Sequence, residues 1–364
     1  MSELEEQKIV DTLEETDKKC PQCDGVMEFD PKTGDLRCPY CEYTEAIKIE
    51  DTTPKKAKEL DFFDAKERQN CDWGVNKKTV ICDSCGAESI YDALEIASVC
   101  PFCGSNQVME ANDKDTMAPG GVVPFQISDK EAAELFQKWI KKKWFCPKLA
   151  KESAKAKSFK GVYFPYWTFD TTTQSSYTAK YGKDRRVRRG DKTVIETDWY
   201  TTSGNHNEFI NDELVLASTT HDQAMLRGLE PFNTEDNKGY KPEYLAGFTA
   251  QRYSVGLEDA WEKAKQLIKR KLENSISKKV RREKHADRVG RINLSTTYSD
   301  ITYKYLLLPV WLSTFKYQDK VYQFMVNGQT GKVSGKTPIS VFRVLLAIFI
   351  AILILGGLYF LNNS

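Results

Sequence analysis

Histidine is the scarcest of the residues that commonly carry catalysis: this chain of 364 residues has three, His206, His221 and His285. The GxSxG and HExxH motifs are absent, as is a cysteine–histidine signature. His206 and His221 have carboxylates close by in the sequence, but such neighbours are common on solvated loops. We therefore predict that the protein is not an enzyme and has no catalytic residues.

A nucleotide-binding motif and a secretory signal are also missing. The segment GKVSGKT, residues 331–337, has three residues between its first glycine and the Gly-Lys pair, where a Walker A motif has four. The acidic N-terminal segment lacks the apolar stretch of a signal peptide. We expect neither ATPase nor helicase activity, and we expect the N-terminal part to stay in a reducing compartment.

Neither sign of charge dominates, because 53 Lys and Arg residues balance 52 Asp and Glu residues to a net charge of +1. This balance hides a division along the chain. Residues 1–115 carry 27 acidic and 14 basic side chains, whereas residues 116–364 carry 25 acidic and 39 basic ones. A uniformly basic nucleic-acid-binding protein is excluded.

Cysteine is where the sequence becomes informative, because eight of the ten cysteines form two quartets with the spacing C-x2-C-x14-C-x2-C. The quartets are Cys20, Cys23, Cys38 and Cys41, and Cys82, Cys85, Cys100 and Cys103. Two CxxC turns supply the four thiolates of a tetrahedral zinc site, and a closed shell leaves no position for a reactive water. The alternatives, redox CxxC pairs or ordinary buried thiols, do not explain why the same spacing occurs twice. We predict two structural Zn²⁺ ions.

The residues around these cysteines fit short metal-binding hairpins. Thr33-Gly34-Asp35 lies in the middle of the first spacer, where a hairpin would turn. Asp24-Gly25 is expected to let the backbone curl around the sulfurs. Both quartets resemble zinc ribbons of the transcription-factor-B type. Because the acidic residues 1–115 would repel phosphates, we expect these ribbons to contact protein.

The C-terminal end is the longest apolar run of the chain. Val344 to Leu361 contains no charged residue in 18 positions, while Lys336 and Arg343 precede it. A helix of this length approaches the ~30 Å hydrocarbon thickness of a bilayer, and cations on one side orient such a helix. We predict one C-terminal transmembrane helix, a single-pass location in the cell membrane with the N-terminal domains cytoplasmic, and the lipid bilayer as a partner.

The middle of the chain shows a weak repeat. In the first half, Ser128-x-x-Glu131 is a capping box that predicts a helix, and an aromatic strand containing Pro165-Tyr166-Trp167 follows. In the second half, a helix beginning near Leu257 precedes a strand containing Pro309-Val310-Trp311. The repeat predicts a duplicated α+β domain with an antiparallel sheet.

The predicted organisation is therefore α+β. We expect an acidic tail at 1–18, zinc ribbons at 19–46 and 76–108 joined by a linker at 47–75, the duplicated α+β domain at 116–338, and the transmembrane helix at 339–361. Three basic runs, around residues 138–151, 183–192 and 278–291, lie within the duplicated domain. They can be solvated surface, a contact with anionic lipid, or an RNA-binding surface that lacks a known motif.

Five segments spread over most of the chain are informative together: LDFFDAKERQNCDWG, VPFQISDKEAAELFQKWI, GVYFPYWTFDTTT, KPEYLAGFTAQRY and LLLPVWLSTFKYQDKVYQFMVNGQTGKVSG. Through these segments the chain as a whole resembles bacterial membrane-anchored zinc-ribbon proteins of the YdjG-like kind. The resemblance implies no catalytic residues. It implies a membrane-associated accessory role, with SPFH (flotillin-like) or PspA-like envelope-stress proteins as partners.

The resulting functional prediction is a non-enzymatic, membrane-anchored zinc-ribbon scaffold or adaptor on the cytoplasmic face. The alternative is a membrane-tethered nucleic-acid-binding regulator that uses its zinc ribbons. Nucleic acid is the less favoured partner, because the ribbons lie in the acidic part of the chain.

Overall fold

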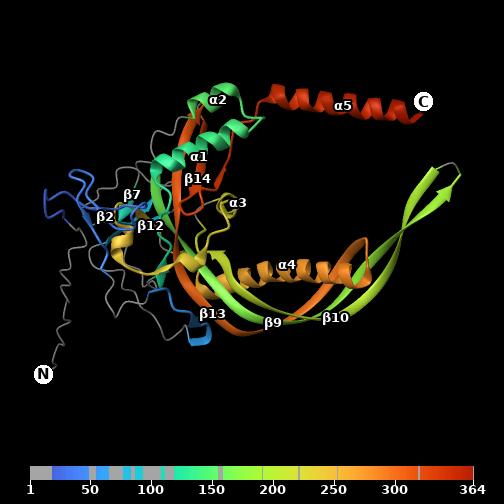
Figure 1. Cartoon of the computed structure of the whole chain (residues 1–364), viewed down its shortest axis with the longest axis horizontal. Helices are drawn as coiled ribbons and strands as arrows, with labels where there is room; N and C mark the ends of the chain where they lie inside the picture. Colours follow the sequence, from blue (N-terminus) through green and yellow to red (C-terminus); the bar gives the residue numbers. More distant parts are fainter. Residues whose placement is uncertain are drawn as a thin grey trace.

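The computed structural model has a mainly antiparallel 12-stranded sheet with helices against it (Figure 1). It describes residues 19–48, 55–64, 77–82, 87–92, 108–110, 119–154, 159–190, 192–219, 222–251, 253–318 and 320–363. The helices are α1 (Asp129–Lys142), α2 (Lys148–Ser153), α3 (Gln223–Arg227), α4 (Leu257–Lys284) and α5 (Val341–Asn363), with short turns η2 (Thr234–Asp236) and η3 (Pro242–Leu245). The α+β class with an antiparallel sheet agrees with the sequence-based prediction.

The strands differ greatly in length. The long ones are β9 (Lys160–Arg189), β10 (Lys192–Leu216) and β13 (Arg288–Tyr317). The others are β1 (Glu28–Phe29), β2 (Leu36–Arg37), β3 (Thr44–Glu45), β4 (Leu60–Asp61), β5 (Lys77–Cys82), β6 (Glu88–Asp92), β7 (Val108–Glu110), β8 (Gly121–Val122), β11 (Lys238–Gly239), β12 (Thr249–Gln251), β14 (Lys320–Asn327) and β15 (Val333–Gly335). Within the segment predicted as a linker, β4 pairs with β13.

The burial of β9 changes along its length, and the sequence explains why. Residues 161–171 are all buried, so both faces of the sheet are covered there, and residues 161–167 are glycine, apolar or aromatic without interruption. From residue 172 to 180 buried and exposed positions alternate, so one face is open to solvent. On the doubly covered part, one face carries Tyr163, Trp167 and Phe169, and the other carries Val162, Phe164 and Tyr166.

The outer parts of β9, β10 and β13, together with α4, form a curved arm (Figure 1). Helix α4 lies against these three strands on the concave side of the arm. Its buried residues follow one another every four positions, so the buried stripe turns by about 40° per step around the helix. A stripe that winds in this way matches strands that coil around the helix. The stripe consists of Ala260, Ala264, Ile268, Leu272, Ile276 and Val280.

The two Pro-x-Trp segments lie in adjacent antiparallel strands. Helix α1 precedes β9, helix α4 precedes β13, and Phe164 of β9 lies opposite Leu308 of β13. These two residues occupy the same place in the two sequence repeats, because each directly precedes the Pro-x-Trp proline. The register thus places equivalent positions of the two Pro-x-Trp segments opposite one another.

Each tryptophan of the repeat contacts the start of the other half's helix. Trp167 donates its indole N–H to the carbonyl of Val255 at 2.9 Å, two residues before α4 begins. Trp311 donates to the carbonyl of Ile127 at 2.8 Å, two residues before α1 begins. A strand of each half thus donates a hydrogen bond to the residues just before the helix of the other half.

The predicted first helix is confirmed. In α1 the Ser128 hydroxyl accepts from the Glu131 N–H at 3.4 Å, and a Glu131 carboxylate oxygen accepts from the Ser128 N–H at 2.8 Å. The apolar side of the helix buries Ala132, Phe136 and Ile140. Phe136 stacks on Phe324 of β14 at 3.5 Å between ring centroids.

The predicted transmembrane helix is wrong. Among the residues that the structure describes, no helix combines the length and the apolarity needed to cross a membrane. Helix α5 does form over Val341–Asn363, but its side chains are described only as far as Gly357. The rest of the predicted span lies outside the described side chains, and the single-pass location with its membrane assignment is not supported.

A buried group of charges lies where the doubly covered sheet gives way to the arm. The Lys304 ammonium is 2.7 Å from Asp212, 3.3 Å from Glu59 and 3.8 Å from Asp170, and its side chain is 8% exposed. Asp212 sits at a bulge of β10, where its φ is +47°. Burial raises the pKa of Asp170 to about 6, although the Asp212 N–H and the Lys304 ammonium act in the opposite direction. Three carboxylates therefore face one ammonium.

We expect Asp170→Asn to change how stability depends on pH. A pKa raised in the folded protein means that the folded state holds the proton more tightly than the unfolded chain. The contribution of Asp170 is therefore greatest below pH ~4 and is lost as the pH rises to about 6. Relative to Asp170→Asn, the wild type should lose up to about 3 kcal/mol of unfolding free energy over this window. Urea titrations at pH 4, 5, 6 and 7 measure the difference, with the exposed Asp64→Asn as control. A difference that does not vary with pH would contradict the prediction.

Candidate metal centre

The first cysteine quartet is built from two similar loops. In the first, the Asp24 N–H donates to the Cys20 carbonyl at 2.8 Å, and the Cys20 N–H donates to the Gly25 carbonyl at 2.7 Å. In the second, the Glu42 N–H donates to the Cys38 carbonyl at 3.0 Å, and Cys38 donates to Tyr43 at 2.8 Å. Each CxxC segment is thus a closed turn that directs both of its thiols to one side.

The hairpin between these loops positions them opposite one another. Strands β1, β2 and β3 form a three-stranded sheet. The β1–β2 turn is closed by the Gly34 N–H, which donates to the Asp30 carbonyl at 2.9 Å, with Gly34 at φ +78°. The turn predicted at Thr33-Gly34-Asp35 is confirmed.

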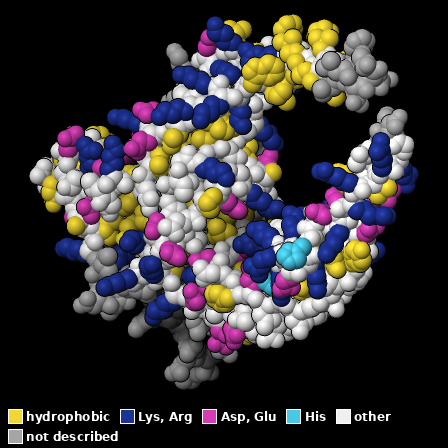
Figure 2. All heavy atoms as spheres, turned by 45° about the vertical axis from the view of Figure 1, so that its right-hand side comes forward, with side chains coloured by type: hydrophobic (Ala, Val, Ile, Leu, Met, Phe, Trp, Pro, Cys, Tyr) yellow, Lys and Arg dark blue, Asp and Glu magenta, His cyan; other side chains and the backbone are white. Residues whose placement is uncertain are grey.

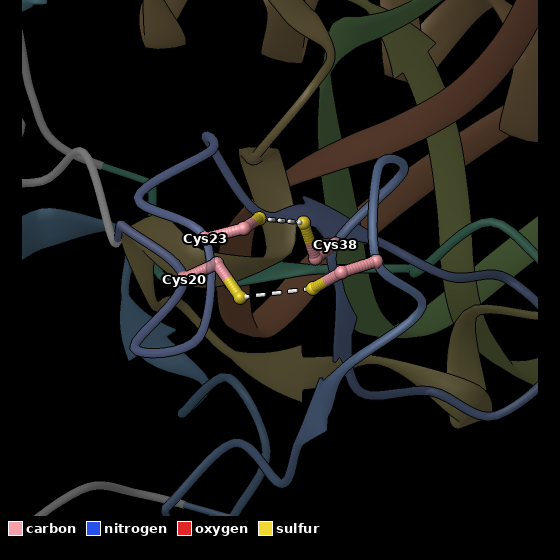
Figure 3. A group of neighbouring side chains, drawn as sticks. Cys20, Cys23 and Cys38 are labelled. Atoms are coloured by element: carbon pink, nitrogen blue, oxygen red, sulfur yellow. Dashed lines mark hydrogen bonds between the residues drawn. The ribbon is translucent and has the colours of Figure 1, made fainter.

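The four sulfurs meet in one place. The sulfurs of Cys20 and Cys41 are 3.4 Å apart, those of Cys23 and Cys38 are 3.5 Å apart, and all four lie within 4.8 Å of one another. Figure 3 shows the side chains of Cys20, Cys23 and Cys38 pointing toward one another between the two loops. Four thiolates about 2.3 Å from a tetrahedral metal ion would lie roughly 3.8 Å apart. The arrangement fits a four-thiolate metal ion.

The local backbone differs from the expectation in one respect. The residues with left-handed φ are Asp24, at +59°, and Glu42, at +64°, each directly after the second cysteine of its turn. Within the Asp24-Gly25 pair that was expected to let the backbone curl, Asp24 has the positive φ and Gly25 does not. Gly25 is required for space instead, because a Cβ there would lie 2.6 Å from the Tyr40 ring.

The four thiols shift one another's pKa values, and the pattern of these shifts favours binding of a cation between them. Burial opposes ionisation of Cys38, but N–H groups of Cys41 and Tyr40 lower its pKa to about 7. For Cys41 the Tyr43 N–H acts to lower the pKa, yet the other thiols of the group and burial raise it to about 12. Four thiols packed together do not all ionise easily alone, whereas a divalent cation stabilises all four thiolates.

The four-cysteine hairpin is anchored to the sheet domain. The Phe29 N–H donates to the Ala246 carbonyl at 3.1 Å, and the Phe29 ring packs edge-on against Tyr244 at 5.8 Å and Phe248 at 6.4 Å. The Tyr163 hydroxyl of β9 in turn donates to the Tyr244 carbonyl at 3.1 Å. Sequence reasoning missed this contact, because nothing in the segment 240–248 marks it as the site where the hairpin packs.

The second quartet lies outside what the structure describes. Cys85, Cys100 and Cys103 are not among the described residues, and of Cys82, the last residue of β5, only the backbone is described. Strand β5 pairs with β6 and β7, and β6 pairs with β12. The backbone on both sides of this quartet thus belongs to the large sheet.

The histidines and the single Cys146 form no second centre among the described residues. His206 contacts Glu208 at 2.8 Å on the arm, and His285 ends α4 with φ +48°. His221 lies outside the described residues. Cys146 is a buried single thiol, and burial raises its pKa.

The fold and the site together define an α+β protein with a mainly antiparallel sheet and an N-terminal four-cysteine centre. The chain is 31% identical to the uncharacterized protein YdjG of Bacillus subtilis (strain 168) over 327 residues, which is 88% of this chain and 90% of that protein. The chain belongs to the YdjG family. No family model and no solved structure matches it.

Proposed function

We propose that the protein is a non-enzymatic scaffold or adaptor, and that its four-cysteine centre is a zinc ribbon with a structural Zn²⁺. The closed set of four thiols carries this proposal, because it leaves no ligand position for water or substrate. Tetrahedral sulfur sites favour zinc or iron, and a closed thiolate shell with zinc has no redox chemistry. The metal then stabilises the fold of the four-cysteine hairpin and so fixes the surface that this hairpin presents.

Metal analysis tests the ribbon. We propose a second zinc at Cys82, Cys85, Cys100 and Cys103, so purified full-length protein should contain two zincs per chain by plasma mass spectrometry. Cys38→Ser with Cys41→Ser should leave one, and Cys146→Ser is the matched control that should keep both. Less than one zinc per chain, or iron in its place, would contradict the assignment.

The surface that the ribbon presents supports an adaptor role. Tyr40 is 78% exposed at the tip of the second loop, where the adjacent cysteines hold its backbone, and Val26 is 46% exposed. Tyrosines on rigid supports are frequent centres of protein interfaces. The resemblance noted above makes SPFH-like and PspA-like proteins the first partners to test.

A co-purification experiment tests the adaptor role. A tagged SPFH-like or PspA-like protein from the same cells should retain the full-length wild type, and Tyr40→Ala should reduce the retained fraction while keeping its zinc. Phe63→Ala is the control, because Phe63 is a similarly exposed aromatic residue, at 74%, outside the ribbon. Equal retention of all three proteins would place the interface elsewhere, and no retention would refute these partners.

A further inference from the structure

Two basic runs that are about a hundred positions apart in the sequence meet at the outer end of the arm. These runs with their immediate neighbours, residues 180–200 and 278–291, are called the arm end below. Arg288 of β13 lies opposite Gly182 of β9. The Asp184 N–H donates to Asp287 at 2.8 Å, and Arg288 pairs with Asp184 at 3.1 Å. The β9–β10 hairpin and the end of α4 thus form one surface.

Acidic residues of the arm end neutralise only some of its cations. Arg185 pairs with Glu196 at 3.1 Å and with Asp198 at 3.0 Å, and Arg189 pairs with Glu196 at 2.8 Å. Within the described part of the chain, several other cations of the arm end have no ion pair with a carboxylate. They include Lys180, Lys183, Arg186, Arg188, Arg281 and Arg282. Figure 2 shows Lys and Arg side chains gathered along the arm and around the hollow that it encloses.

Half-exposed aromatic rings lie among these cations. Trp199 is 50% exposed and lies against the backbone of two glycines, because a Cβ at Gly290 would be 3.1 Å from its ring and one at Gly182 would be 3.4 Å from it. Tyr200 is 48% exposed on the opposite face and stacks on Tyr181 at 5.4 Å. Each ring therefore presents a flat surface to solvent within a basic environment.

We propose that the arm end binds single-stranded nucleic acid, with Trp199 and Tyr200 stacking on bases and the surrounding Lys and Arg contacting phosphates. A positively charged surface with aromatic rings is the combination that non-specific single-strand binding uses. A double helix would offer no unstacked bases to the rings, and a flat lipid surface could not contact both faces of the hairpin. This site is separate from the zinc ribbon and goes beyond the adaptor role.

Fluorescence anisotropy with full-length protein and a labelled 20-nucleotide oligo(dT) tests the proposal. A matched oligomer with abasic sites keeps the phosphates and lacks the bases. The wild type should bind oligo(dT) about ten-fold more tightly than the abasic strand. Its log–log salt dependence should have a slope of about −3.5 if about five phosphates are contacted.

Two variants separate the roles of charge and stacking. Arg186→Glu with Arg281→Glu should weaken binding to both strands by about ten-fold or more. Trp199→Ala with Tyr200→Ala should weaken only oligo(dT), to the level of the abasic strand. Lys138→Glu with Lys141→Glu, on the basic surface of α1, is the control and should bind as the wild type does. Zinc content and far-ultraviolet circular dichroism should be unchanged in every variant.

Three outcomes would overturn the proposal. Equal affinity for the intact and the abasic strand would show a general polyanion surface. A loss of binding in the α1 control equal to that at the arm end would place the contact elsewhere. Tighter binding to vesicles of phosphatidylglycerol than to oligo(dT), sensitive to Arg186→Glu with Arg281→Glu, would identify anionic lipid as the ligand.

Discussion

Replacing Cys38 and Cys41 by serine is expected to unfold the segment 19–48 in otherwise folded protein. The segment buries few apolar side chains of its own, chiefly Met27, Phe29 and Leu36. At about 2 kcal/mol each, their burial is far below the conformational entropy of about thirty ordered residues. Structural zinc contributes about 10–16 kcal/mol of apparent binding free energy in small zinc modules. Without the metal, the segment should therefore lose its structure.

Hydrogen exchange measured by mass spectrometry would check this result. Amides of residues 19–48 should exchange within the dead time in the double variant and slowly in the wild type. The segment 240–248 should exchange faster as well, because Phe29 no longer packs on Tyr244 and Phe248. The long strands β9 and β13 should keep their protection. Slow exchange of residues 19–48 in the double variant would show that the hairpin folds without a metal.

Trp167→Ala is expected to lower the free energy of unfolding by about 4–5 kcal/mol, which is a large part of the stability of an ordinary domain. Trp167 is 1% exposed and packs against Tyr253, Tyr303 and Tyr305 at centroid distances of 5.3, 5.9 and 5.0 Å. The substitution removes these contacts and leaves the Val255 carbonyl without its indole donor. Urea unfolding followed by circular dichroism measures the effect.

Less drastic substitutions separate packing from hydrogen bonding. Trp167→Phe keeps a ring but loses the N–H, so we expect a loss of about 1–3 kcal/mol. Trp311→Phe should have a similar effect, because Trp311 makes the corresponding hydrogen bond to Ile127. Trp144→Phe, at a side chain that is 50% exposed, should change stability by less than about 0.5 kcal/mol. If Trp167→Ala cost no more than this control, the indole would not hold the start of α4.

Local patterns determined the parts of the structure that depend on nearby residues. The Ser128–Glu131 capping box predicted where α1 begins, because both of its hydrogen bonds join residues three positions apart. The spacing of Cys20, Cys23, Cys38 and Cys41 predicted that their sulfurs would meet, since two tight turns and a hairpin bring them together.

The apolar C-terminal run shows where composition alone misled. A run of apolar residues in the sequence predicted a membrane-spanning helix. In the described part of the chain, however, no helix has the combination of length and apolarity that crossing a membrane requires. The sequence thus determined that the segment is an apolar helix, but not that it crosses a membrane.

By itself, then, the sequence determined the four-cysteine centre, the helix starts and the α+β class, because turns, caps and hydrophobic periodicity act over a few residues. Only the tertiary structure decided which distant segments meet. Phe29 packs on residues 244–248, Trp167 and Trp311 exchange contacts between the halves, and Lys304 gathers carboxylates from separate segments. The two basic runs of the arm end became one surface because β9 pairs with β13. The register of long strands sets these contacts, and no local pattern encodes it.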